Sequence, residues 1–274
     1  MIVIQARTGS TRLPGKVLAR LAGATLLERM VERVLAANVD AKVVVATSVL
    51  AEDDAIRQIC KRRSFRCFSG DPYDLLARHV GAARSVGADV LVKIPSDCPL
   101  IDPAVVERVL GFASSNREHF DFVTNLLPPS FPDGQDVEVM ATSLAERALV
   151  EARERFEREH TTPFFWLRPE RFRLGNVSWR EGRDLSARHR WTVDYPEDLT
   201  LVRCVYDALW SANQPAFGVE SILDFLEDNP EVDELNARWR GTAWWRQLPT
   251  SRRPDRGPSK HERVMIHRSW GSPA

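Results

Sequence analysis

The first eighteen residues place three cations in one glycine-containing loop. Residues 1–6 form a short apolar segment typical of a buried strand, and Arg7, Arg12 and Lys16 follow it. Glycines in the loop let the backbone turn sharply and bring its N–H groups near a ligand, while guanidinium and ammonium groups donate to phosphate oxygens. The loop therefore predicts a polyphosphate site, with an exposed basic turn as the alternative.

Two common phosphate-binding motifs do not fit this loop. A Walker A loop has the pattern GxxxxGK[ST]. Here five residues separate Gly9 from Gly15, and Val17 follows Lys16. The GxGxxG dinucleotide fingerprint is also absent from the loop. We therefore expect neither a P-loop nor a dinucleotide site.

A carboxylate follows the apolar segment DVLVKI, which covers residues 89–94. It is Asp97, in PSDCPLIDP, and Mg²⁺ prefers carboxylate and phosphate oxygens as ligands. Asp102 has a different explanation, because Asp is a good helix N-cap and Pro103 a good first residue. The residues alone thus make Asp97 a candidate metal ligand and Asp102 a structural residue.

A second candidate lies in RWTVDYPEDL, residues 190–199. Asp194 ends a predicted strand at 190–193 and comes just before Pro196, which fits the first residue of a helix. Taken alone, Asp194 fits a helix cap better than a metal ligand. Asp198 fits a charge in the first turn of that helix.

The first half alternates between apolar and amphipathic segments. We predict strands at 1–6, 42–47, 66–69 and 89–94, separated by helices at 26–35, 53–63 and 73–86. Such alternation is typical of a Rossmann-like α/β layer with a parallel sheet, which binds ligands beyond the carboxyl ends of its strands. The basic loop and Asp97 should therefore meet there.

The second half is less regular. Strands are expected at 121–125, 136–140, 171–179 and 190–193, and helices from Pro196 and at 219–227 and 231–239. Ser143 and Glu146 have the spacing of a capping box for a helix that runs to about Phe156.

Composition excludes several classes of protein. The 274 residues include 38 basic and 38 acidic side chains, so the chain lacks the global field of a general nucleic-acid binder. Its four cysteines show no CxxC pair, which argues against structural zinc and a disulfide framework and favours a reducing cytoplasm. No signal peptide or membrane span is expected. Residues 249–274 are basic and rich in Pro and Ser, and predict a flexible tail after a domain at 1–248.

The motifs also resemble those of one family. Residues 5–18 and 190–199, with 68–83, 95–103, 131–140 and 158–166, are similar to the cytidylyltransferases that make CMP-activated sugar acids, in their SpsF-like branch. The resemblance implies a three-layer nucleotidyltransferase fold with a mostly parallel central sheet, and it assigns 125–180 to a smaller acceptor and dimerisation subregion. Ser96 departs from the pattern, since the family usually has Gly there.

The resemblance also assigns roles to residues. Mg²⁺ would be held by Asp97 and Asp194, which with Arg12 and Lys16 form the catalytic set. The acceptor would contact Asp136 and Glu138, alternating on one strand face, and His160 with Thr161. The nucleotide CTP would be bound by Gln5, Ala6, Arg7, Gly9, Ser10, Arg12, Lys16 and Ser96.

The implied reaction is transfer of CMP from CTP to an acidic, nonulosonic-acid-like sugar, with release of pyrophosphate. Another nucleotide, a phosphonate or a sugar phosphate is an alternative substrate. A glycosyltransferase or a nucleotide-binding protein without turnover is an alternative function. The family resemblance also implies a homodimer, and neither a membrane nor a nucleic acid is expected as a partner.

Overall fold

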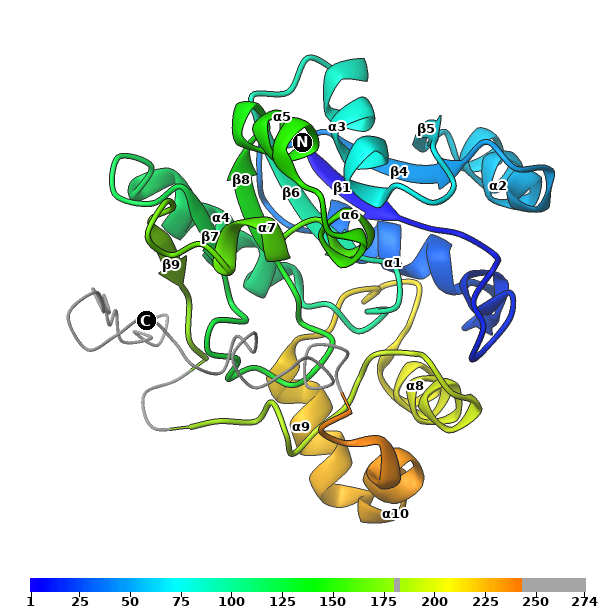
Figure 1. Ribbon diagram of the computed structural model, residues 1–274. Helices are drawn as coiled ribbons and strands as arrows, with labels where there is room; N and C mark the ends of the chain where they lie inside the picture. The colour runs from blue at the N-terminus through cyan, green and yellow to red at the C-terminus, as the bar shows by residue number, and fades with distance from the viewer. Residues whose placement is uncertain (180–182, 243–274) are drawn as a thin grey trace.

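The computed structural model describes residues 1–179 and 183–242. One sheet with the order β5-β4-β1-β6-β8-β7-β9 lies between two layers of helices (Figure 1). In chain order its strands are β1 (Ile2–Gln5), β4 (Val43–Ser48), β5 (Arg66–Gly70), β6 (Val90–Pro95), β7 (Phe122–Thr124), β8 (Glu138–Ala141) and β9 (Leu174–Asn176). Two short strands, β2 (Arg20–Leu21) and β3 (Ala24–Thr25), form a separate hairpin.

The parallel half of the sheet is built from strands that are buried on both faces. β1 pairs in parallel with β4 and β6, and β4 pairs in parallel with β5. Ile2, Val3 and Ile4 are fully buried, as expected where helices cover both faces of a parallel sheet. The register aligns Gln5 with Pro95, so the carboxyl ends of β1 and β6 lie side by side.

β8 reverses the direction of the sheet. It runs antiparallel to both β6 and β7, and β9 then pairs in parallel with β7. The register places Glu138, the first residue of β8, opposite Lys93 near the end of β6. The start of β8 therefore lies at the same edge as the ends of β1 and β6.

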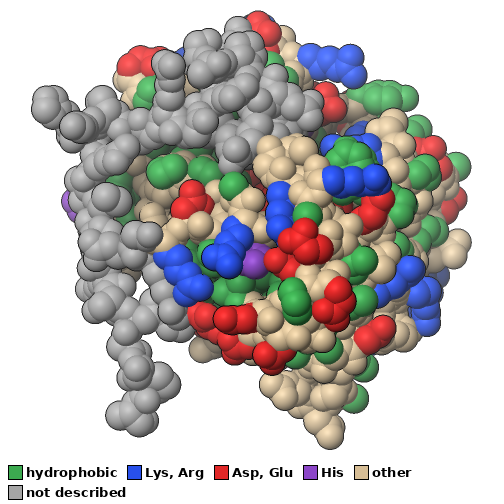
Figure 2. Space-filling model, turned by 90° about the horizontal axis from the view of Figure 1, so that it is seen from below, with side chains coloured by type: hydrophobic (Ala, Val, Ile, Leu, Met, Phe, Trp, Pro, Cys, Tyr) green, Lys and Arg blue, Asp and Glu red, His purple; other side chains and the backbone are tan. Residues whose placement is uncertain are grey.

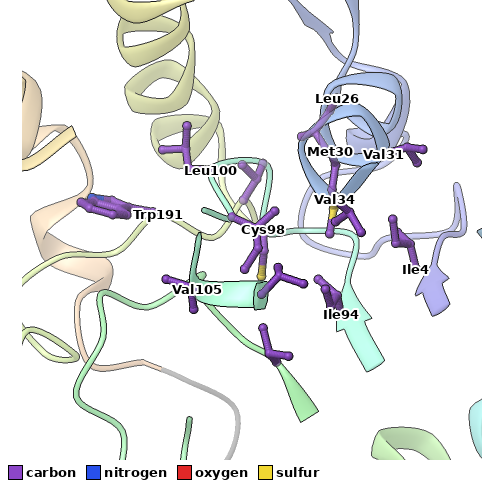
Figure 3. Close-up of a cluster of buried hydrophobic side chains, with 14 of the residues drawn as sticks. Ile4, Leu26, Met30, Val31, Val34, Ile94, Cys98, Leu100, Val105 and Trp191 are labelled. Carbon is purple, nitrogen blue, oxygen red and sulfur yellow. The ribbon is translucent and has the colours of Figure 1, made fainter. Parts of the chain in front are cut away.

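The helices divide between two hydrophobic clusters. In chain order they are α1 (Leu26–Leu35), α2 (Asp54–Arg63), α3 (Leu75–Ser85), α4 (Pro103–Ser115), α5 (Thr142–Glu151), α6 (Arg155–His160), α7 (Pro163–Trp166), α8 (Pro196–Leu209), α9 (Val219–Asp228) and α10 (Pro230–Asp233), with 3-10 turns at Lys16–Leu18, Ala51–Asp53 and Glu234–Trp239. The helices of one cluster, α3, α5 and α7, pack on one face of the sheet. The helices α1, α2 and α4 pack on the other face, where α8 and α9 extend the core. Cys98 and Leu100 lie between Trp191 and the apolar side of α1 (Figure 3).

The expected fold class is confirmed, and so are two helix starts. Asp102 caps α4, because its carboxylate accepts the backbone N–H of Ala104 at 2.8 Å and Pro103 is the first helical residue. Pro196 begins α8 as expected. The chain thus forms a mostly parallel three-layer α/β fold.

The strand expected at 190–193 was wrong. The segment is extended, but the N–H groups of Trp191 and Val193 donate to the carbonyls of Asp133 and Asp97, which both lie in loops. Only an isolated bridge joins Arg190 to Asp133, so no ladder forms. Backbone hydrogen bonds to the loop of Asp133 and to the loop of Asp97 hold the segment between these two loops.

Three other boundaries differ from expectation. The capping box at Ser143 does not form, because α5 begins one residue earlier, at Thr142, and Glu146 pairs with Arg84 on α3. α5 ends at Glu151, and the following turns form the separate helix α6. β8 begins at Glu138, so Asp136 precedes the strand instead of sharing a face with Glu138.

Two further expectations concern membrane-spanning helices and the basic C-terminal tail. Among the residues that the structure describes, none of the helices has the length and hydrophobicity needed to cross a membrane. The predicted basic tail, 249–274, lies outside the described residues.

Candidate active site

The ammonium group of Lys16 joins the two candidate metal ligands. Its Nζ lies 3.2 Å from Asp97 Oδ2 and 2.9 Å from Asp194 Oδ1, and it also donates to the carbonyl of Val193 at 2.8 Å. Lys16 follows the loop after β1, Asp97 follows β6, and Asp194 precedes α8. Three segments far apart in the sequence therefore meet at one point beyond the carboxyl ends of β1 and β6.

Asp194 is held by cations on both of its oxygens. Arg12 and Lys16 contact Oδ1, at 2.7 and 2.9 Å, and Arg190 donates to Oδ2 at 2.9 Å. Arg190 is buried and also pairs with Asp133 at 3.2 Å and with Asp198 at 3.1 Å. These contacts fix the carboxylate plane of Asp194.

Asp198 organises the turn before α8. Instead of a solvated first-turn charge, it is fully buried and accepts the backbone N–H groups of Asp194 and Tyr195 at 2.9 Å each. Asn236 also donates to it, at 2.8 Å. Asp198 thus joins the turn that carries Asp194 to the 3-10 helix near the end of the described chain.

Burial and charge act in opposite directions on the groups at this point. Burial alone would lower the pKa of Lys16. The negative charges of Asp97 and Asp194 outweigh this effect, so the pKa of Lys16 is raised above its ordinary value. Burial raises the pKa of Asp194, but Lys16, Arg12 and Arg190 bring it below its ordinary value. Lys16 therefore stays protonated and Asp194 ionised near neutral pH.

These groups line one open cavity of about 480 Å³, within the range of small-molecule sites. The space-filling view shows basic and acidic side chains and a histidine exposed beside one another on the face seen from below (Figure 2). Of the residues proposed from sequence, the lining includes Gln5, Ala6, Arg7, Ser10, Arg12, Lys16, Ser96, Asp97, Asp136, Glu138, His160 and Asp194.

Acidic groups gather at the β8 end of the cavity. Glu138 forms a buried ion pair with Lys93 at 2.5 Å. Burial, with Asp133 and Glu138 nearby, raises the pKa of Asp136 well above its usual value. Burial also lowers the pKa of His160, to about 4, helped by the positive charges of Lys93 and Arg7. A neutral imidazole and a carboxyl group with a raised pKa suit hydrogen bonds to hydroxyl groups.

Two sequence candidates do not line the cavity. Gly9 faces Glu52, whose Oε1 would lie 3.1 Å from an added Cβ. Thr161 is fully buried, with a φ of 71°, and its Oγ1 lies 3.0 Å from Nδ1 of His79. The other ring nitrogen of His79 lies 3.1 Å from Oε1 of Gln5, so Thr161 acts on the cavity only through this chain.

Ser96 fits its turn without strain. Its side chain lines the cavity, and the positive-φ residues other than glycine in the described chain are Ala22, Ser64 and Thr161. Because the turn does not need a left-handed residue at position 96, Ser replaces the usual Gly at no backbone cost.

Several polar residues of the cavity were not found from sequence. Lys93 appeared to be part of an apolar strand, and Arg78 to be part of an amphipathic helix. Arg190 gave a signal, because it lies four residues before Asp194 in the same motif.

The carboxylates fit a divalent ion that is also held by substrate. Asp97 and Asp194 converge on one cation, and carboxylates with phosphate oxygens form the ligand set that Mg²⁺ prefers. The described residues contain no cluster of three or more His, Cys, Asp or Glu side chains able to hold a metal by themselves. Nucleotide oxygens and water would have to complete the coordination.

Comparison with known proteins agrees with this geometry. The sequence profile of the family described as Cytidylyltransferase matches residues 1–229. The chain belongs to this family. As a cytidylyltransferase it is a nucleotidyltransferase of the EC 2.7.7 type, which confirms the class of enzyme expected from the motifs.

Relatives match this cytidylyltransferase over most of their length. It is 30% identical over 240 residues to uncharacterized protein MJ1063 of Methanocaldococcus jannaschii, covering 87% of this chain and 94% of that protein. It is 28% identical over 237 residues to the spore coat polysaccharide biosynthesis protein SpsF of Bacillus subtilis, covering 85% and 95%.

Two solved structures share its fold. A cytidylyltransferase from Leptospira borgpetersenii superposes with a TM-score of 0.79 at 31% identity, covering 85% of this chain and 95% of that one. The CMP:2-keto-3-deoxy-manno-octonic acid synthetase complexed with CTP has a TM-score of 0.57 at 19% identity, covering 75% and 97%. The second likeness bears on the fold alone.

Proposed function

We propose that this cytidylyltransferase transfers CMP from CTP to a hydroxyl group of an acidic sugar and releases pyrophosphate, with Mg²⁺ as cofactor. The observation that carries the proposal is the convergence of Asp97 and Asp194 on Lys16, beside the basic loop after β1. It supports a site where a triphosphate and a metal ion meet. Family membership favours nucleotidyl transfer over glycosyl transfer.

The cations of the loop have two sets of partners in this proposal. In the structure, Arg12 and Lys16 neutralise Asp194 and Asp97. When nucleotide binds, they turn to its β and γ phosphates and stabilise the charge that develops on the leaving pyrophosphate. Bound Mg²⁺, held by Asp97 and Asp194, would supply charge neutralisation at the α-phosphate and lower the pKa of the acceptor hydroxyl.

The acceptor binds at the β8 end of the cavity in this proposal. Glu138 is anchored by Lys93, whereas Asp136 makes no hydrogen bond or ion pair with any other described residue. Asp136 can therefore accept from, or when protonated donate to, a sugar hydroxyl. His160 lines the same cavity and stays neutral near pH 7, because its pKa is lowered to about 4.

The test is pyrophosphate release from CTP with a panel of sugar acids, each with and without Mg²⁺. We expect Mg²⁺-dependent release with CTP in preference to UTP, ATP and GTP. Asp194→Asn should abolish release while circular dichroism remains native, because the carboxylate and not the fold is lost. The control is Asp224→Asn, at an exposed position of α9, which should keep full activity.

Each outcome separates the alternatives. Release with another nucleotide would keep the chemistry and change the product. Binding of CTP without release, for every acceptor tried, would favour a nucleotide-binding protein without turnover. Unchanged release in Asp194→Asn would remove Asp194 from the site.

A homodimer through residues 125–175 is also part of the proposal. On α5, within this region, Val150 is a large apolar side chain that is 70% exposed. Light scattering of the purified chain should give twice the mass of one chain. Val150→Asp should shift that mass toward one chain, and a monomeric wild-type protein would contradict the proposal.

A further inference from the structure

One guanidinium group lines the cavity with two nitrogen atoms that find no hydrogen-bond partner among the described residues. Arg78, on α3, is only 4% exposed, and its Nε and Nη1 have no hydrogen-bond partner within 1–179 and 183–242. The side chain also contributes to the cavity wall. Burying a charge without a partner is strongly unfavourable, so a cavity ligand is the natural source of the missing acceptor.

The acidic residues around Arg78 are engaged elsewhere. Asp53 accepts from Ser48 and Thr8, and Asp71 accepts the backbone N–H groups of its own turn. Asp74 pairs with Arg158 on α6, at 2.7 Å from its Nε. The three carboxylates raise the pKa of Arg78 through space, but none of them bonds to it.

The stem of Arg78 is held in place by close packing. A Cβ added at Gly70 would lie 3.3 Å from Arg78 Cγ and 2.7 Å from the ring of Phe68. Any side chain at position 70 would therefore push against both neighbours. The glycine allows α3 and β5 to approach, and this approach fixes where the guanidinium enters the cavity.

Arg7 is a second cation that lines the same cavity, and unlike Arg78 it is exposed. It lines the cavity, yet it forms no ion pair with the described residues, in contrast to Arg12 and Lys16, which pair with Asp194. Burial lowers the pKa of Arg78, and the nearby charge of Arg7 lowers it further. Two neighbouring cations that bond to no carboxylate among the described residues favour an anionic ligand.

We propose that Arg78 and Arg7 form an anion subsite of the cavity, separate from the Arg12 and Lys16 cations, which binds an oxyanion of one substrate. The oxyanion is either a phosphate of the nucleotide or the carboxylate of the acceptor. The identity of the bound oxyanion rests on the proposed function. The existence of the subsite rests on the guanidinium group of Arg78, which has no hydrogen-bond partner among the described residues at Nε and Nη1.

The test is calorimetric titration of the full chain with three probes: CTP, inorganic pyrophosphate and 2-keto-3-deoxy-manno-octonic acid. Arg78→Gln should raise the Kd of at least one probe by tenfold or more. The matched control, Arg84→Gln, lies on the same helix, where Arg84 is exposed and pairs with Glu146. It should leave every Kd within twofold.

The probes whose affinity falls in Arg78→Gln identify the oxyanion that the subsite binds. Weaker binding of CTP and pyrophosphate with an unchanged sugar acid assigns a phosphate, and the reverse pattern assigns the acceptor carboxylate. Unchanged affinities for all three probes in Arg78→Gln, or wild-type protein that binds none of them, would overturn the subsite.

A second measurement guards against misfolding. Because Arg78→Gln removes a buried charge without a partner, the ligand-free variant should melt at or above the wild-type temperature, and a clear fall would show a structural role instead. If pyrophosphate or the sugar acid binds through Arg78 while CTP yields no pyrophosphate, the subsite stands and the proposed function fails.

Discussion

Arg190 Nη2 lies 2.9 Å from Asp194 Oδ2, and this contact decides which oxygen of Asp194 faces the cavity. With Oδ2 taken, Oδ1 remains for Lys16 and Arg12. Arg190 touches no site expected for the reacting atoms, so it acts as a positioning residue for the carboxylate.

Replacing Arg190 should destabilise the protein more than replacing a surface arginine. Arg190→Gln leaves three carboxylates without their buried cation, and we expect a loss of about 3–5 kcal/mol in the free energy of unfolding. Arg173→Gln is the control, because Arg173 pairs with Asp121 while more than half exposed, and its loss should change the free energy of unfolding far less. Urea denaturation measures both, and equal losses would contradict the role of Arg190.

Lys16→Ala should affect two ligands in opposite directions. Removing the ammonium frees Asp97 and Asp194, so Mn²⁺, used as a paramagnetic probe, should bind the nucleotide-free variant several-fold more tightly than wild type. CTP should bind about tenfold or more weakly, because a charged contact to phosphate is lost. Electron paramagnetic resonance and calorimetry report the two affinities. An unchanged CTP affinity would refute the triphosphate role of Lys16.

His160 should remain neutral through the pH range in which most histidines titrate. Its pKa is lowered from 6.5 to about 4, so the unfolded chain binds this proton more readily than the folded one between these values. The contribution to stability is complete above pH 6.5 and is lost as pH falls toward 4, by at most about 3 kcal/mol. An NMR titration, assigned with His160→Gln, measures the shift; a midpoint near 6.5 would contradict it.

Two glycine substitutions should change the stability of the fold in opposite directions. Gly134 has a φ of 112°, and an added Cβ would lie 2.9 Å from the backbone of Trp191, so Gly134→Ala should cost more than about 1 kcal/mol and disturb neighbouring Asp133. Gly111 lies inside α4 with nothing within 4 Å, and Gly111→Ala should stabilise by about 0.5–1 kcal/mol. Thermal melts compare the two variants, and equal signs would contradict the argument.

The sequence predicted the central meeting point because topology determines it. Parallel strands bring their carboxyl ends to one edge, so the loop after β1 and Asp97 after β6 had to be neighbours. Asp194 needed the family resemblance, because its residue type and position taken alone fit a helix cap better than a metal ligand. The extended segment that carries it bonds to two loops, and such pairings leave no periodic pattern.

Helix α3 supplies one part of the cavity that the sequence did not predict. Arg78 and His79 occupy inward positions of an amphipathic helix, where a sequence pattern cannot tell a core contact from a cavity wall. That difference depends on how closely α3 approaches β5. Gly70 permits the close approach, but a glycine in the sequence does not by itself predict it.

The hydrogen-bonded chain from Thr161 through His79 to Gln5 has a fixed order of protons. Because Oε1 of Gln5 can only accept, the imidazole must carry its proton on Nε2, and its Nδ1 must accept from the Thr161 hydroxyl. The amide nitrogen of Gln5 is then left to the cavity as a donor. This order of protons means that the floor beside β1 offers a ligand a proton and not a lone pair.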